Sequence, residues 1–103
     1  MITQVLSMSI HDGKLGGAFA WAVKIAAYIN QQSPDLNVRV VRNVAGSMYE
    51  LHFVSTTESL AAYEDFNKQL EADEGYQKLL SEGREQRLII GTTVNERLYE
   101  TVP

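Results

Sequence analysis

The chain has 103 residues, enough for one domain with a modest core, and pairing of two copies would add buried area. Its net charge is −4 and its lysines and arginines form no cluster, which argues against nucleic acid and anionic membranes as partners. The absence of cysteine excludes disulfides, thiolate catalysis and zinc–thiolate sites, and it fits a reducing compartment, here expected to be the cytoplasm.

Residues 2 to 10 are predicted to form the first strand, because their side chains alternate between an apolar and a mixed face. The apolar face carries Ile2, Gln4, Leu6, Met8 and Ile10, and the mixed face Thr3, Val5, Ser7 and Ser9. No basic segment precedes the strand, so it does not resemble a signal peptide. No stretch of the chain reaches the roughly 18 apolar residues of a membrane-spanning helix. The Asp12-Gly13 pair is a turn signal that ends the strand.

Residues 14 to 32 are predicted to form a helix with one broad apolar stripe. The stripe consists of Leu15, Ala18, Phe19, Ala22, Ile25, Ala26 and Ile29. Trp21, Val23 and Tyr28 lie off it, so the helix is apolar around more of its circumference than one sheet face needs. Either part of this helix borders a cavity or it touches a second subunit. Pro34 ends the helix, because proline cannot continue the hydrogen-bond ladder.

Two strands are predicted next, at residues 37 to 45 and 48 to 55, joined as a hairpin through Gly46-Ser47. Ser59 occupies the position of a helix N-cap. The helix that follows has a stripe at steps of three and four residues, formed by Leu60, Tyr63, Phe66 and Leu70.

The second helix is predicted to break at residues 73 to 75. Asp73 can cap a second short segment that carries Tyr76, Leu79 and Leu80. Gly83 is expected to close that segment, because glycine is common just after a helix. Residues 88 to 94 form a fourth strand, and residues 98 to 102 either extend it or form a short fifth strand.

This order of elements predicts a single α+β domain over residues 1 to 103, of the ferredoxin-like split β-α-β type. One four-stranded antiparallel sheet would carry both helices on one face. The face beneath the helices would hold Leu6, Met8, Ile10, Val38, Val40, Leu51, Phe53, Leu88 and Ile90. The other face would hold Val5, Ser7, Ser9, Arg39, Val41, Asn43, Glu50, His52, Val54 and Ile89. This second face is too apolar for water and too polar for a dry core, so we expect it to pack against a second copy.

Several segments resemble a known superfamily. They are LHFV at Leu51–Val54, SLAAYEDF from Ser59, Asp73 with Tyr76, and IGTT from Ile90. Together they resemble the dimeric α+β barrel proteins, which include the antibiotic-biosynthesis-monooxygenase-like and NIPSNAP-like groups, and the similarity is greatest to uncharacterised members.

The resemblance implies a homodimer whose two sheets face each other, with a ligand cleft between the sheet and the helices of each subunit. The superfamily includes cofactor-free oxygenases, haem-degrading enzymes, isomerases and proteins without an assigned activity, so the fold cannot choose a function. The Asn, Trp and His arrangement of the haem-degrading members has no match here, since Trp21 is in the first predicted helix.

Three polar residues are candidates for catalysis. His52 shares a face with Glu50 and neighbours Arg39 and Asn43, so it is either a general base or an interfacial histidine held by polar neighbours. His11 lies in the turn with Asp12, where turn formation is the simpler role. Arg42 interrupts an apolar face and either anchors an anionic ligand or lies at the sheet rim.

Four aromatic residues are candidates for lining a ligand cleft: Trp21, Tyr28, Tyr63 and Phe66. Such a lining suits a flat hydrophobic ligand, although aromatics at helical spacing are also ordinary core residues. No phosphate loop, nucleophile elbow or set of metal ligands is present in the sequence, and no cofactor is expected.

Two functions are compatible with the sequence. The preferred one is a homodimeric protein that binds a small hydrophobic or aromatic molecule in the helix–sheet cleft. The alternative is a cofactor-independent monooxygenase or isomerase acting on a small aromatic or polyketide-like substrate, with His52, His11 or Arg42 assisting.

Overall fold

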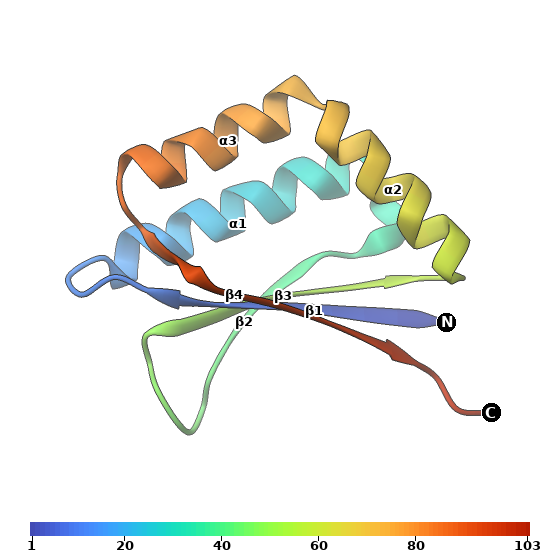
Figure 1. Cartoon of the computed structure of the whole chain (residues 1–103), viewed down its shortest axis with the longest axis horizontal. Coiled ribbons are helices and arrows are strands. Elements are labelled where there is room, and N and C mark those ends of the chain that lie inside the picture. Colours follow the sequence, from blue (N-terminus) through green and yellow to red (C-terminus); the bar gives the residue numbers. More distant parts are fainter.

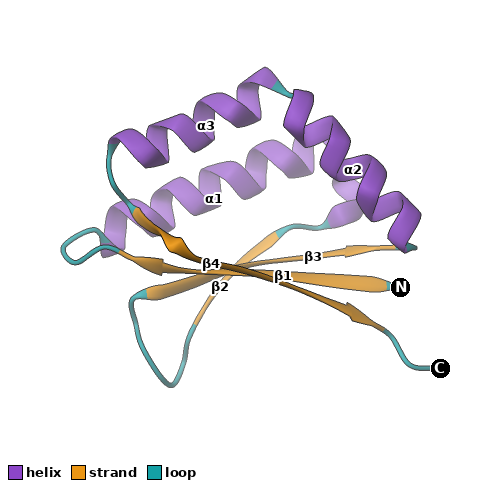
Figure 2. Cartoon of the chain, in the orientation of Figure 1, coloured by secondary structure: helices purple, strands orange, loops and turns teal.

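A computed structural model describes all residues, 1 to 103, and has a four-stranded antiparallel sheet with three helices on one face (Figure 1, Figure 2). The elements are β1 (Ile2–Ile10), α1 (Leu15–Gln32), the 3-10 turn η1 (Pro34–Leu36), β2 (Arg39–Arg42), β3 (Glu50–Thr57), α2 (Leu60–Ala72), α3 (Glu74–Glu85) and β4 (Ile89–Glu100). The strand order is β2-β3-β1-β4. The predicted ferredoxin-like α+β sandwich is therefore confirmed.

Both predicted helix caps are present. The backbone N–H of Ala62 donates to the Ser59 hydroxyl at 3.2 Å, which starts α2. Asp73 ends α2 and starts α3, because the N–H of Tyr76 donates to its carboxylate at 2.9 Å. Each cap satisfies a backbone donor that has no partner within the helix. The second helix is thus divided at Asp73, as the sequence predicts.

Gly83 does not close α3, contrary to the prediction. The helix continues to Glu85, and the chain turns at Arg87, whose φ is 54°. Gly83 is buried against Trp21 of α1 instead. A Cβ at position 83 would lie 2.6 Å from two atoms of the indole ring, so the missing side chain is what allows α1 and α3 to approach.

The core lies between the helices and the sheet. Leu51 and Leu88 are its most deeply buried large side chains. Ile89 pairs with Ile10 and packs against the core, whereas Ile90 pairs with Ser9 and so lies on the open face, the reverse of the prediction. The reason is that Leu88 belongs to the turn before β4, so the strand's alternation starts one residue later.

The strand pairs also differ in detail from the prediction. The loop between β2 and β3 spans residues 43 to 49, because the Asn43 amide donates to the Ser47 carbonyl at 2.8 Å and closes a turn there. The end of the chain extends β4 rather than forming a fifth strand. Pairing of β1 with β4 is irregular between Ser7 and Ser9, so β4 contains extra residues at that point.

The second face of the sheet is not covered by any helix (Figure 1). It carries the mixture of apolar and polar side chains expected from the sequence, including Val5, Val54 and the more exposed Val41. No helix of the chain combines the length and apolar character that a membrane span needs. The cytoplasmic location expected from the sequence stays a prediction.

Candidate functional site

A cavity of about 340 Å³ lies between the helices and the sheet. Its apolar lining consists of Leu6, Met8, Trp21, Ile25, Ile29, Val38, Phe53, Phe66, Leu70, Tyr76 and Leu80. Its polar lining consists of Gln4, Ser55, Asn67, Glu71, Gln77 and Glu96. A volume in the range of about 300–1,000 Å³, with apolar walls and a few polar groups, is typical of small-molecule sites.

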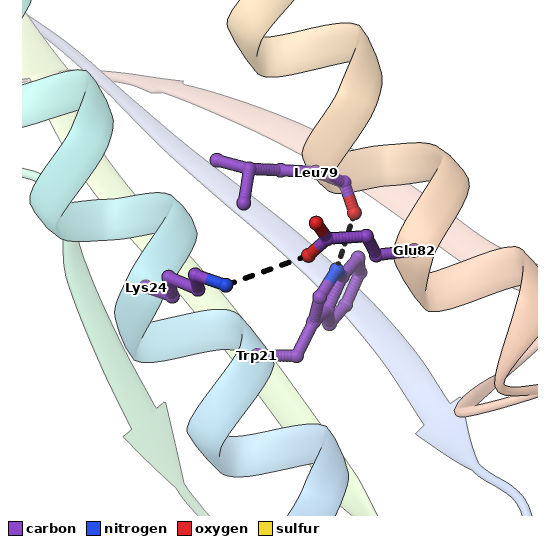
Figure 3. A network of polar contacts seen from close by, with 4 residues as sticks. All are labelled: Trp21, Lys24, Leu79 and Glu82. Atoms are coloured by element: carbon purple, nitrogen blue, oxygen red, sulfur yellow. Dashed lines mark hydrogen bonds and ion pairs between the residues drawn. The ribbon is translucent and has the colours of Figure 1, made fainter.

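Trp21 forms a fixed part of the cavity wall. Its indole N–H donates to the Leu79 carbonyl of α3 at 2.7 Å (Figure 3). Its ring meets Phe53 of β3 edge to face, with centroids 6.5 Å apart and planes at 81°. Beside it, Lys24 and Glu82 form an ion pair at 3.5 Å between α1 and α3. This pair is largely exposed and contributes little to stability, so the indole is held mainly by its hydrogen bond and by packing.

Three polar residues of the lining, together with Tyr63 beside it, form a hydrogen-bonded cluster from four different elements. Glu96 of β4 accepts hydrogen bonds through Oε2 from the Gln4 amide at 2.6 Å and from the Tyr63 hydroxyl. The Gln4 amide also reaches the Tyr63 oxygen at 3.3 Å. The Ser55 hydroxyl donates to Gln4 Oε1 at 3.1 Å. We call these four residues, Gln4, Ser55, Tyr63 and Glu96, the polar cluster.

Tyr63 is the member of the polar cluster that lies on α2, and it is the most buried aromatic residue of that helix. Burial raises the pKa of its phenol, and its hydrogen bond to Glu96 raises that pKa further. The phenol therefore stays protonated at neutral pH and acts as a donor to the carboxylate. This orientation matters for the site, because it commits the only proton of Tyr63 to Glu96.

The four aromatic candidates from the sequence have different positions. Trp21 and Phe66 line the cavity. Tyr63 is not part of the lining but bonds to two residues that are. Tyr28 lies away from the cavity, where its hydroxyl donates to Asp73 at 2.6 Å and its ring packs on Gly75. Tyr28 thus joins α1 to the junction between α2 and α3.

None of the three polar candidates lines the cavity. His11 is exposed in the loop after β1. Arg42 is exposed at the end of the edge strand β2, opposite Leu51, and forms no ion pair. His52 lies on the uncovered sheet face, between β1 and the loop that follows β2.

His52 is held by hydrogen bonds on both ring nitrogens. Its Nε2 is 2.8 Å from Asn43 Oδ1, and its Nδ1 is 2.6 Å from the Ser7 hydroxyl. The Asn43 amide nitrogen donates to the carbonyl of Ser47 and to Glu50, which fixes the orientation of the amide. The Nε2 atom must therefore carry the proton, so Nδ1 of the neutral ring accepts from Ser7. This network orders the open face of the sheet and does not face the cavity.

The residues that sequence reasoning missed are the polar ones of the cavity. Gln4 could have been predicted as a site residue, because it is the only polar side chain on the inward face of the first predicted strand. Glu96 could not have been predicted from the sequence, because its position opposite Leu6 depends on the irregular pairing of β4.

Comparisons with known proteins bear on the fold. No protein family model matches the chain, and no curated protein sequence matches it either. Among solved structures, protein Atu4242 from Agrobacterium tumefaciens has a TM-score of 0.79 and 15% identity, over 99% of this chain and 94% of that one. An uncharacterised NIPSNAP domain protein from Burkholderia xenovorans has a TM-score of 0.74 and 15% identity, over 100% and 94%.

A third similar structure is SnoaB, a cofactor-independent oxygenase from Streptomyces nogalater, with a TM-score of 0.70 and 15% identity over 97% of this chain and 91% of that one. At such low identity the likeness concerns the fold and not the activity. The resemblance to the antibiotic-biosynthesis-monooxygenase-like and NIPSNAP-like proteins is therefore confirmed at the level of the fold, which this chain shares over nearly its whole length.

Proposed function

We propose that the protein is a homodimer that binds a small hydrophobic or aromatic molecule in the helix–sheet cavity. The observation that carries this proposal is the cavity itself, with 11 hydrophobic residues among the 17 that line it. A cleft of this size with mostly apolar walls is typical of small-molecule sites. Its wall includes an indole that is fixed by its own hydrogen bond, which gives a ligand a rigid contact surface.

The volume indicates how large the ligand is. Water occupies about 30 Å³ per molecule in the liquid, so the cavity has the volume of about 11 water molecules. Two fused aromatic rings with one substituent fit within this volume. The edges of Trp21, Phe53 and Phe66 offer suitable contact surfaces for such a ring system.

The uncovered sheet face supports the homodimer. Val41 and Tyr99 are 40% and 49% exposed there, and the hydrogen-bonded network around His52 lies on the same face. A second copy placed on the same face would remove these side chains from water. The enzymatic alternative gains no support from His11, His52 or Arg42, since none of them reaches the cavity.

The proposed binding can be tested with 2-naphthol, which has 11 non-hydrogen atoms. Trp21 is the only tryptophan, so a single indole N–H resonance in a two-dimensional 1H–15N spectrum reports on the cavity wall. We expect that resonance to shift with saturable dependence on ligand concentration. No shift at the solubility limit of 2-naphthol would contradict the proposal.

A pair of substitutions on α2 provides the control. Leu70→Phe enlarges a side chain of the lining and is expected to weaken binding by about tenfold or more, because the ligand would clash with the added ring. Leu60→Phe makes the same change at a position that is 51% exposed, and should leave the affinity unchanged. Equal affinities of the two variants would show that the ligand binds elsewhere.

A further inference from the structure

The charges of the cavity lining all have one sign. Glu71 and Glu96 are its only charged residues, and no lysine, arginine or histidine contributes to it. Glu96 is moreover hydrogen-bonded to Gln4 and Tyr63 of the polar cluster, so its carboxylate has a fixed position beside the cavity. A ligand with a carboxylate or phosphate would meet repulsion and would find no cationic partner.

The donors of the polar cluster are already in use. The two amide hydrogens of Gln4 go to Glu96 and Tyr63, the Tyr63 proton goes to Glu96, and the Ser55 proton goes to Gln4. An ionised carboxylate accepts only, and each of its oxygens has two lone pairs. Within the protein, only Oε2 of Glu96 is bonded, so Oε1 keeps its full capacity to accept.

The other polar groups of the lining, the amides of Asn67 and Gln77 and the hydroxyl of Tyr76, carry no charge. The Gln77 amide donates one hydrogen to the Glu71 carbonyl at 3.5 Å, so these groups keep both donors and acceptors. Within the polar cluster, by contrast, every donor is used, and the free capacity is acceptor capacity whose charged member is Glu96.

We infer that Glu96 determines the specificity of the site, which takes a ligand that carries an O–H or N–H donor and no negative charge. This inference rests on the proposed binding function and adds the chemical class of the ligand. The donor of the ligand would bond to Oε1 of Glu96, while its apolar body contacts Trp21, Phe53 and Phe66. A hydrogen bond to an ionised acceptor is stronger than one between neutral groups.

Three probes of similar size test separately whether the ligand needs a hydrogen-bond donor and whether a negative charge on the ligand weakens binding. At pH 7, 2-naphthol is neutral and has a donor, 2-methoxynaphthalene has the same oxygen without a donor, and 2-naphthoate is an anion. By calorimetric titration of the full chain, we expect 2-naphthol to bind about tenfold or more tightly than either of the others. Equal or tighter binding of 2-naphthoate or 2-methoxynaphthalene would overturn the inference and leave the proposed function intact. Binding of none of the three would overturn both.

The variant Glu96→Gln tests the residue itself. It removes the charge and adds an N–H donor, so the preference for 2-naphthol over 2-naphthoate should fall by about tenfold or more. Glu85→Gln, at the exposed end of α3, is the matched control and should keep the wild-type preference. A wild-type preference in Glu96→Gln, in protein whose circular dichroism spectrum is unchanged, would refute the role of Glu96. The wild-type comparison of the three probes does not depend on this variant.

Discussion

Replacing Gly83 by alanine is expected to destabilise the protein, although alanine favours a helix interior over glycine by about 1 kcal/mol. The added Cβ would lie 2.6 Å from Cε2 and from Cζ2 of the Trp21 indole, both atoms of a rigid ring. Ordinary contacts between carbon atoms are about 3.5–4.0 Å, so the ring or the helix must move by about 1 Å. That movement acts directly on the bond from Trp21 to the Leu79 carbonyl, which is 2.7 Å long.

The expected magnitude follows from three contributions. Overpacking of a core typically costs about 1–3 kcal/mol. Loss or weakening of the indole hydrogen bond adds about 1 kcal/mol, and the better helix propensity of alanine offsets about 1 kcal/mol. The net loss is therefore about 1–3 kcal/mol in the free energy of unfolding. For a domain of this size, each kcal/mol lowers Tm by about 4–8 °C.

Urea denaturation followed by circular dichroism measures this loss, at one fixed protein concentration because association would change the apparent stability. Gly16→Ala in α1 is the matched control, since nothing lies within 4 Å of a Cβ at that position. It is expected to leave stability unchanged or raise it by up to about 1 kcal/mol. A Gly83→Ala protein as stable as Gly16→Ala would refute the reasoning.

A double-mutant cycle identifies the clash. In a Trp21→Phe background the atoms that the new Cβ would meet are absent, so Gly83→Ala should cost less there by about 0.5–3 kcal/mol, the range for residues in contact. An unchanged cost in that background would show that the strain arises elsewhere, for example in the α3 backbone.

Three further predictions concern other parts of the molecule. Ser59→Ala should lower the free energy of unfolding by about 1 kcal/mol in urea denaturation, because α2 loses its N-cap. The hydrogen bond from the Tyr28 hydroxyl lowers the pKa of Asp73, so it stabilises the fold at any pH above the pKa that Asp73 has in the unfolded chain. This stabilisation is lost as pH falls through the lower pKa that Asp73 has in the folded protein. Tyr28→Phe should therefore show a shallower loss of stability on acidification, and an unchanged slope would contradict this. Val41→Lys should convert the proposed dimer to a monomer in sedimentation velocity, whereas Val23→Lys, on the exposed side of α1, should not.

The order of the elements and their caps could be predicted from the sequence, because these features depend on residues close together in the chain. Ser59 bonds to a residue three positions later, and Asp73 does the same. The alternation along β1 likewise follows from the period of a strand, which sends successive side chains to opposite faces. Such patterns also placed Trp21 and Phe66 on the surfaces that enclose the cavity.

The contents of the site depended on the tertiary structure. Gln4 and Glu96 are 92 residues apart and meet only because β4 pairs with β1 through an irregular register, which no local pattern encodes. The sequence indicates Gly83 as the end of a helix, yet its role is set by an indole from another helix. The sequence alone therefore determined which faces are apolar and where helices start, since these follow from backbone hydrogen bonding and side-chain period. The acceptor character of the polar cluster was decided by long-range pairing, because only that pairing brings Gln4, Ser55, Tyr63 and Glu96 together and gives each donor its partner.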